Sequence, residues 1–358
     1  MRIITIVALI MFFVSCKKEV TKEHNFTQAT IETVYQDSIS IRAITMDKNL
    51  LMYAGNNGKY GYFKLNKRYV ENNALYQFFK KKNTGVFNFE GKKPSFRAIA
   101  DTRAYFFVLS IESPALLYKV SKRSGKVKLV YTERHEKIFY NSMMFWNEKE
   151  GIAMGDPVSD CLSILITRDG GESWNKLSCN ELPKTIEGEA AFAASDSNIS
   201  IVGDKTWIIS GGMKSRVFYS PDKGKNWEVY ELPIVQGTST TGAYTIHFYD
   251  ESNGVVFGGD YTKPEKNIAN KAITKDGGKT WQLIATGKEP GYKSSVRYIP
   301  NSGGKEMVAI GFTGLSISND YGENWKELSK EAFLTLRFVN DSTAIAAGRD
   351  RIARIVFR

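Results

Sequence analysis

The stretch TKDGGKTW, at residues 274–281, occurs in three further versions along the chain. They read TRDGGESW (167–174), SPDKGKNW (220–227) and SNDYGENW (318–325), and all four fit the template S/T-x-D-x-G-x-x-W. The tryptophans of the motif lie 53, 54 and 44 residues apart: Trp174, Trp227, Trp281 and Trp325. A local motif at such intervals predicts a repeat architecture.

The motif has the composition of a hairpin turn. An aspartate side chain can accept hydrogen bonds from nearby backbone N–H groups, and glycine tolerates a positive φ angle. The tryptophan then begins the returning strand and can bury its ring against the neighbouring sheet. Because a turn already explains each carboxylate, we assign a structural role to the four aspartates: Asp169, Asp222, Asp276 and Asp320.

The four motifs resemble the Asp box of sialidase-like, or BNR, repeat proteins. The resemblance implies a fold rather than a function, because in that family the box fixes a turn away from the active face. We therefore call each copy a box turn and look elsewhere for the site.

Each box turn closes a unit of four strands, in which the second strand ends at a small residue. Further units without a box lie at residues 40–65, 95–131 and 335–358. In the unit that contains Trp227, AAFAAS (190–195) is assigned as the first strand and DSNISIVGDK as an insert. The small residues mark seven units: Gly55, Ser110, Gly155, Gly211, Gly258, Gly311 and Gly348.

The seventh unit supplies only three strands, and TIETVYQD (30–37) is a β-branched segment without a unit. Placing this segment as the outer strand of the last unit removes an exposed edge and joins the ends of a ring. We therefore predict an all-β fold, a single seven-bladed β-propeller over residues 27–358. Six or eight blades are the alternatives, because residues 66–94 can contain extra strands.

The composition suits a β-rich globular chain of 358 residues, with 21 Phe, 18 Tyr and 30 Gly. The net charge of +11 is spread along the chain, and the densest basic run is Lys80–Lys82. No nucleic-acid-binding signature accompanies this run, so a solvated basic loop is favoured and no nucleic-acid partner is expected.

The N-terminus has the pattern of a targeting segment. Arg2 precedes an apolar run that ends at Val14, which is too short to span a bilayer and fits a signal peptide. The sequence Phe13-Val14-Ser15-Cys16 resembles a bacterial lipobox, which implies cleavage before Cys16 and a lipid on its sulfur. We expect a signal peptide at residues 1–15, a polar tether at 16–26 and a lipid-anchored protein of the bacterial envelope. An ordinary secretory signal is the alternative.

Cys161 and Cys179 flank the first box turn. If the hairpin is centred near Gly170, they lie opposite each other on paired strands, at a separation that suits a disulfide. An oxidising envelope permits the bond, and two buried free thiols are the alternative. Two cysteines without histidine partners predict no metal site.

A recurring arginine indicates a binding surface. The first strands read SIRAI, SFRAI, SVRYI and TLRFV, with His247 in the same register in YTIHFY and with Met144 and Phe192 in the two remaining boxed units. We expect the basic residues to surround the axis on one face: Arg42, Arg97, His247, Arg297 and Arg337. Such a cluster would bind carboxylates, phosphates or an acidic protein surface. Alternatively, each arginine pairs with an aspartate or a carbonyl between blades.

Acidic residues near this face offer a second reading. Asp156 and Asp260 follow glycines at matching positions and are expected to cap loops, while Glu187 and Glu189 lie before the fourth unit. A sialidase-like hydrolase or glycan-binding protein would need an arginine triad beside a Tyr/Glu pair, with Tyr244 or Tyr298 near Glu189. The family's R-I-P motif is absent, no catalytic residue is assigned, and no cofactor is predicted.

The repeat region also resembles the photosystem II stability/assembly factor group, through the SFRAI strand starts, the Ala-Gly second strands and the D-G-G-x-x-W boxes. That resemblance implies a non-enzymatic chaperone that binds membrane-protein partners. It does not carry over the partner, because nothing in the chain indicates photosynthesis. We therefore expect a binding or assembly scaffold that holds a protein or an anionic glycan or other ligand at the arginine-lined face.

Overall fold

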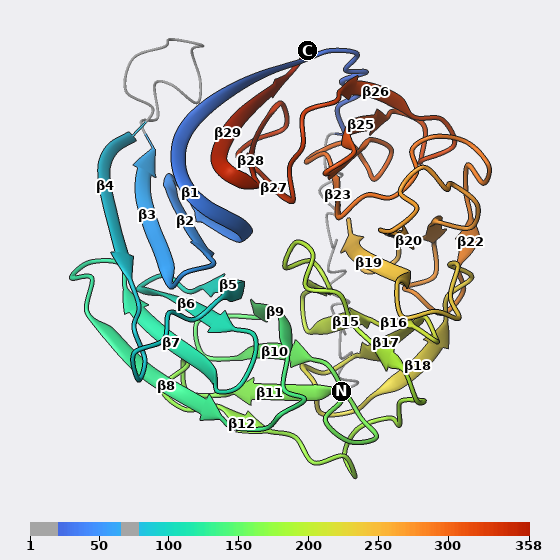
Figure 1. Ribbon diagram of the computed structural model, residues 1–358. Helices are drawn as coiled ribbons and strands as arrows, with labels where there is room; N and C mark the ends of the chain where they lie inside the picture. Colours follow the sequence, from blue (N-terminus) through green and yellow to red (C-terminus); the bar gives the residue numbers. More distant parts are fainter. Residues whose placement is uncertain (1–20, 66–78) are drawn as a thin grey trace, which may run out of the picture.

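The computed structural model describes residues 21–65 and 79–358, and all regular elements in these ranges are strands. The strands pair in antiparallel sheets that stand side by side around a ring (Figure 1). Each sheet runs from an inner strand near the axis to an outer strand at the rim. This is the predicted all-β propeller.

Within the described part of the chain, the strand order fits seven blades of four strands. Blade one contains the second half of β1 (Ala29–Asp47), β2 (Leu50–Gly55), β3 (Lys59–Leu65) and β4 (Phe79–Val86). Blade two contains β5 (Phe96–Asp101), β6 (Tyr105–Ser110), β7 (Ala115–Ser121) and β8 (Val127–Glu133). Blade three contains β9 (Tyr140–Phe145), β10 (Gly151–Gly155), β11 (Ser163–Thr167) and β12 (Asn175–Lys176). Blades four and five contain β14 (Ile199–Val202), β15 (Lys205–Ile209), β17 (Arg216–Ser220) and β18 (Glu228–Glu231); and β19 (Thr241–Phe248), β20 (Gly254–Asp260), β21 (Lys271–Thr274) and β22 (Gln282–Leu283). The last two contain β23 (Ser295–Tyr298), β24 (Met307–Gly311), β25 (Gly314–Ser318) and β26 (Lys326–Ser329); and β27 (Thr335–Phe338), β28 (Thr343–Ala347), β29 (Arg349–Phe357) and the first half of β1.

Neighbouring blades pack face to face, so many inner strands are covered on both sides. β24 (MVAIG) and β25 (GLSIS) are buried at every position, whereas the outer strand β8 (VKLVYTE) is largely exposed. A strand with two covered faces appears in the sequence as a short continuous apolar run. The core therefore lies between blades; one cluster joins Met52 of blade one to Phe106 and Val108 of blade two.

The predicted closure of the ring is confirmed. β1 is a single long strand whose first part, Ala29 to Ser40, pairs with β29, while Ile41 to Asp47 pair with β2 (Figure 1). Tyr35 packs against Phe63 of blade one, with ring centroids 4.9 Å apart. One continuous strand thus belongs to both the last blade and the first.

The ring has two faces, which we name by their loops. The start face is where the inner strands begin and where the second strand of each blade turns into the third. The box face is where the inner strands end and where the box turns lie. There the N–H of Gly170 donates to Lys149 O, and the N–H of Gly277 donates to Ser252 O, so each of these box turns rests on the first turn of its own blade.

Blade four differs from the prediction. Its inner strand is β14, which lies inside the presumed insert, and AAFAAS does not form it. Gly211 belongs to β16 (Gly211–Gly212), which pairs with β13 (Glu189–Ala190) and β19 instead of ending the second strand β15. The small and apolar residues of AAFAAS, which suggested a strand, are explained by the position of this segment, which enters the centre of the ring.

Candidate functional site

Residues Ala193–Ser197 cross the axis of the propeller and close it; we call this segment the plug. All five residues are buried. The plug is bonded to the inner strands around it: Ile246 N–H donates to Ser197 O, Thr335 Oγ1 to Ser195 O, and Ser195 Oγ to Ser294 O. Asp196 has a φ of 54°, in the left-handed region that aspartate enters more readily than most non-glycine residues.

The Asp196 side chain holds the opposite side of the ring. Its two carboxylate oxygens accept the N–H groups of Ile99, at 3.0 Å, and Met143, at 3.1 Å. Burial raises the pKa of Asp196 to about 7, although nearby Arg337 and these hydrogen bonds act in the other direction. The plug therefore links blades two, three, five, six and seven through one short segment.

The predicted basic residues do not share one level of the ring. His247, Arg297 and Arg337 lie opposite Val255, Val308 and Ile345 of the second strands. The same level holds uncharged residues in the other four blades: Thr45, Ala100, Met144 and Ser200. Met144 is thus where it was predicted, whereas Phe192 is not, and Ser200 takes its place.

Arg42 and Arg97 lie about three residues nearer the start face, at β-bulges that follow the pairs Ile41–Gly55 and Phe96–Ser110. A bulge inserts one unpaired residue and shifts the register of everything after it. The strand starts look alike as letters but pair differently. Ile41, just before Arg42, lies opposite Gly55 at the end of its second strand, whereas Ser295, two residues before Arg297, already lies opposite Ile310. The bulge adds to this offset and does not cause all of it. The expected single ring is in fact two pairs, one on each side of the plug.

On the start face, both arginines bind plug carbonyls. Arg42 donates to Ala194 O at 3.2 Å, and Arg97 donates to Ala193 O at 3.0 Å. Burial and the neighbouring charge of Arg42 lower the pKa of Arg97 to about 10, so the guanidinium remains charged at neutral pH. Burial likewise lowers the pKa of Arg42, and Arg349 adds to this effect. Three positive charges therefore gather at this mouth of the channel.

Aromatic side chains extend outward from these arginines. Phe192 stacks on Tyr244 with centroids 3.9 Å apart, Tyr244 contacts Tyr292 at 4.8 Å, and Tyr292 contacts Phe312 at 5.0 Å. Phe312 is 42% exposed and borders an open depression of about 520 Å³ with Arg42, Arg349 and Arg351. Other exposed apolar residues lie in loops of the same face: Ile186, Met213, Tyr261 and Ile268. Arg351 pairs with Glu331 at 2.6 Å, whereas Arg42 and Arg349 have no ion pair in the described ranges. Exposed apolar surface beside polar groups is a feature of interaction sites.

On the box face, Arg297 and Arg337 border a separate pocket of about 380 Å³ together with His247. Arg297 donates to Ser197 Oγ at 2.8 Å, and Arg337 donates to Asp196 O at 3.1 Å. In the described ranges, no carboxylate forms an ion pair with either of these arginines, or with Arg42 or Arg97. The alternative prediction, that each arginine pairs with an aspartate or a carbonyl, therefore holds for three of the four arginines, each of which binds a carbonyl. Arg297 binds a hydroxyl group instead.

The box turns have one hydrogen-bond pattern. In the copy at 274–281, Asp276 accepts the N–H and the hydroxyl of Thr280, and Gly278 N–H donates to Thr274 Oγ1. In the copy at 167–174, partial burial opposes ionisation of Asp169, but hydrogen bonds from Ser173 and its neighbours outweigh it and lower its pKa to about 2. The same side-chain and backbone acceptors recur at Asp222 and Asp320.

The tryptophans of the box turns lie between blades. The Trp325 ring meets Phe257 of the preceding blade edge-on at 5.0 Å, and Trp174 contacts Phe107 at 6.2 Å. Trp227 and Trp281 donate their ring N–H to the glycine carbonyl three residues earlier. Each contact explains the motif without a ligand.

The predicted acidic residues are all on the start-face side and have structural partners. Asp156 accepts hydrogen bonds from Asn141 and Ala191 N–H, and burial raises its pKa to about 6. Asp260 caps Thr262. Glu189 is buried against Arg216, and Glu187 is exposed.

The arrangement expected of a sialidase is not assembled from these residues. The Tyr244 hydroxyl donates to Thr240 O on the start face, whereas Tyr298 borders the pocket on the box face. Glu189 binds Arg216 and so meets neither tyrosine through a hydrogen bond. The arginines themselves are divided by the plug.

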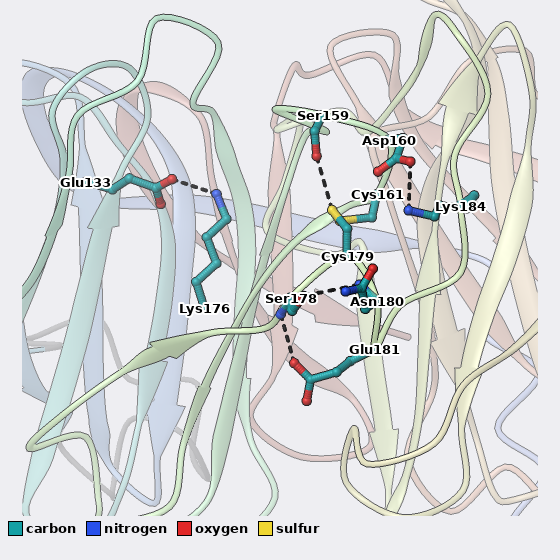
Figure 2. The surroundings of a disulfide bond; sticks show 10 residues. All are labelled: Glu133, Ser159, Asp160, Cys161, Lys176, Ser178, Cys179, Asn180, Glu181 and Lys184. Atoms are coloured by element: carbon teal, nitrogen blue, oxygen red, sulfur yellow. Dashed lines mark hydrogen bonds and ion pairs between the residues drawn. A yellow bond between two sulfur atoms is a disulfide. The ribbon is translucent and has the colours of Figure 1, made fainter.

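Cys161 and Cys179 are joined by a disulfide with their Cα atoms 5.5 Å apart (Figure 2). Cys161 precedes β11 and Cys179 follows β12, so the bond ties the linker into blade four to blade three. Nearby, Asp160 pairs with Lys184 at 2.7 Å. These two cysteines and Asp160 form the one group of potential metal ligands in the described ranges, and both sulfurs are in the disulfide.

The end of the predicted tether lies against the propeller. His24 is buried between Glu306, at 2.5 Å, and Asp341, at 3.1 Å, and its ring stacks on Phe26. Lys22 N–H donates to Asn301 O. The partners lie in turns of blades six and seven on the box face, so the chain approaches the ring from that side. Cys16 lies outside the described residues. No helix in the described part of the chain has the length and apolarity needed to cross a membrane.

Comparison with known proteins supports the fold. No protein-family model and no curated protein matches the chain. Among solved structures, YCF48 bound to a D1 peptide is similar with a TM-score of 0.63 and 11% identity, over 94% of this chain and 99% of that one. The structure of U3-55K has a TM-score of 0.60 and 14% identity, over 91% of this chain and 98% of that one. The WD40 repeats of RRP9 have a TM-score of 0.60 and 12% identity, over 92% of this chain and 97% of that one. These similarities establish the β-propeller and do not establish a function.

Proposed function

We propose that the chain is a non-catalytic binding or assembly scaffold that holds a protein partner on the start face of the propeller. The observation that carries the proposal is the group formed by Arg42, Arg97 and Arg349 beside the exposed ring of Phe312. In the described ranges no carboxylate forms an ion pair with these three cations. Arg42, Arg349 and Phe312 border one depression, in which Arg351 is paired with Glu331 at 2.6 Å. YCF48, which shares the fold, has been solved with a peptide bound.

The partner that suits this surface is a polypeptide segment with carboxylates next to apolar side chains. A guanidinium binds a carboxylate through paired N–H donors, and the exposed ring of Phe312 offers area to apolar groups. An exposed ion pair alone contributes little, but here Arg42 and Arg97 are already withdrawn from water by the plug and their neighbours. We expect the affinity to fall as salt rises, because part of the attraction is between charges at the surface.

A double substitution tests the proposal. Arg42→Gln with Arg349→Gln removes two charges from the depression, and Arg123→Gln removes one exposed charge from the opposite face as a matched control. A fluorescent acidic peptide with aromatic residues should bind the wild type and the control and lose at least about tenfold in affinity for the double variant. Raising the salt concentration should weaken the binding of this peptide to the wild type, and a charge-reversed version of the peptide should bind the wild type less tightly. Equal affinity for all three proteins would reject the start face.

A pull-down from envelope extracts extends the same comparison to natural partners. Proteins retained by the wild type and by Arg123→Gln, but not by the double variant, are candidates for the partner. An identical set of proteins for all three baits contradicts the proposal. The glycoside-hydrolase alternative has its own test, in which a panel of fluorogenic glycosides is expected to remain uncleaved.

We further propose that the protein is a lipoprotein of the bacterial envelope, attached through Cys16. The supporting observations are the lipobox-like sequence and the approach of residues 22–26 from the box face, which would leave the start face directed away from the anchor. Labelling with a fatty-acid analogue should mark the wild type and not Cys16→Ser. Equal labelling of the two proteins would contradict attachment at this residue.

A further inference from the structure

The pocket on the box face has donors that internal acceptors satisfy only in part. Arg337 donates to Thr335 Oγ1, Leu336 O and Asp196 O. The described residues give Arg297 one hydrogen bond, to Ser197 Oγ, and its Nε–H is buried without a partner. A guanidinium has five N–H donors, so most of those on Arg297 are free for a ligand. Leaving buried donors unpaired is unfavourable, and a site that does so is prepared for an acceptor.

His247 adds a donor with a defined orientation. Its Nδ1 faces the N–H of Tyr298 at 3.2 Å, which makes Nδ1 the acceptor. In the neutral ring the proton must then be on Nε2, which becomes a hydrogen-bond donor. Burial, followed by the charges of Arg297 and Arg337, holds the pKa of His247 well below its usual range, so the ring is neutral near pH 7.

The three donors come from consecutive blades at one level. β19, β23 and β27 carry His247, Arg297 and Arg337 opposite equivalent residues of their second strands. The remaining blades contribute Thr45, Ala100, Met144 and Ser200 to the wall across the pocket. One side of the pocket is therefore cationic, and the other is mostly apolar, with Asp101 and the Asp196 carboxylate as its acidic groups.

The acidic residues that border the pocket are already engaged. Asp196 accepts two backbone N–H groups on the side of blades two and three. Asp101 accepts from Thr45 at 2.7 Å and pairs with Lys122 at 2.7 Å. Neither carboxylate forms an ion pair with Arg297 or Arg337, so the pocket keeps a positive charge.

We propose that this pocket binds a small oxyanion, a phosphate or carboxylate group carried on a body of about sugar size. The anion would accept from Arg297, from the Nε2–H of His247 and from Arg337. A volume of about 380 Å³ is at the lower end of the range found for small-molecule sites, and the mostly apolar wall opposite the arginines can contact the body of the ligand. The plug separates this site from the start face, so it goes beyond the proposed protein-binding role.

Titration calorimetry with four probes tests the inference: inorganic phosphate, a hexose phosphate, a hexuronate and the neutral hexose. The wild type should bind at least one of the three anions, and it should bind the neutral hexose at least about tenfold more weakly. Arg297→Gln should lose roughly tenfold to hundredfold, as expected for a charged hydrogen-bonded pair. Arg103→Gln, which removes an exposed charge from the same face outside the pocket, should bind as the wild type does.

A second variant keeps the test decisive if Arg297→Gln does not fold. Met144→Glu leaves every arginine in place and puts a carboxylate across the pocket, where it should compete with the ligand and weaken binding about tenfold. The hexose phosphate and hexuronate arms distinguish a phosphate site from a carboxylate site. Folded wild-type protein that binds none of the anions at about 10 mM, or equal affinities in the wild type and the pocket variants, would overturn the proposal. Start-face peptide binding is measured separately, so either idea can fail alone.

Discussion

Replacing His247 with asparagine is expected to remove a defined part of the acid sensitivity of the protein. His247 is buried between two arginines, and burial and these charges hold its pKa well below the ordinary value. In the unfolded chain the pKa returns to about 6.5. Below that pH the unfolded state binds a proton that the folded state does not bind. The contribution of His247 to the free energy of unfolding therefore falls as the pH falls.

The magnitude follows from proton linkage. For an imidazole that stays neutral in the folded chain, each pH unit below the unfolded pKa removes about 1.4 kcal/mol. Between pH 7.5 and pH 5 the loss is about 2 kcal/mol, which is a large fraction of the stability of an ordinary domain. Asparagine cannot take up this proton, and its Oδ1 can replace Nδ1 as the acceptor for Tyr298 N–H.

Two buried carboxyl groups act in the opposite direction, so the variant must be compared with the wild type. The pKa of Asp156 is raised to about 6 and that of Asp196 to about 7. Their contribution is fully present below the unfolded pKa near 3.9 and is lost as the pH rises through the folded values. Both aspartates are present in both proteins, and their effect cancels in the difference.

Urea unfolding at pH 7.5 and pH 5 measures that difference. The free energy of unfolding of the wild type, minus that of His247→Asn, should fall by about 2 kcal/mol between the two conditions. A difference that stays constant within about 0.5 kcal/mol would show that His247 titrates normally in the folded chain, and it would refute the effect assigned here to burial and the neighbouring arginines.

Three further predictions concern the fold. Deleting residues 27–37 should abolish cooperative thermal unfolding, because the last blade would lose its outer strand; unchanged melting would contradict the closure. Mass spectrometry of unreduced protein should find the Cys161–Cys179 crosslink, and reduction should cost about 3 kcal/mol for a closed loop of this length. Asp276→Ala should destabilise by about 1–2 kcal/mol through lost hydrogen bonds from Thr280, whereas Lys275→Ala should change little in the same urea titration.

The repeat and the closure were predictable from sequence because they rest on local chemistry. A box turn requires a carboxylate, a glycine and a tryptophan within eight residues, and each copy carries its own signal. The closing strand was found by elimination, since TIETVYQD had strand composition and the last unit lacked a strand. Both arguments need only residues that are adjacent in sequence and the rule that a sheet edge must be covered.

The arrangement of the arginines was not predictable in the same way. Arg42 and Arg297 occupy the third position of similar strand starts, yet a different pairing with the second strand, together with a bulge, places them on opposite sides of the plug. A bulge changes hydrogen-bond pairing between strands and has no reliable mark in the letters. The plug was missed because AAFAAS has the alternation of a strand. The available signal was the pair of polar residues Asp196 and Ser197 directly after it, followed by the β-branched run at Ile199.

The plug also explains how the chain can keep four arginines near its axis without carboxylate partners. Removing a guanidinium from water is unfavourable unless its donors are satisfied, and the carbonyls of Ala193, Ala194 and Asp196 satisfy them only in part. The cost of withdrawing these charges from water is then met during folding, before any ligand arrives. An incoming anion need not strip water from flexible side chains, because it meets donors that are already oriented. The same segment divides these donors between two faces, so the proposed protein partner and the proposed oxyanion would not compete for the same arginine.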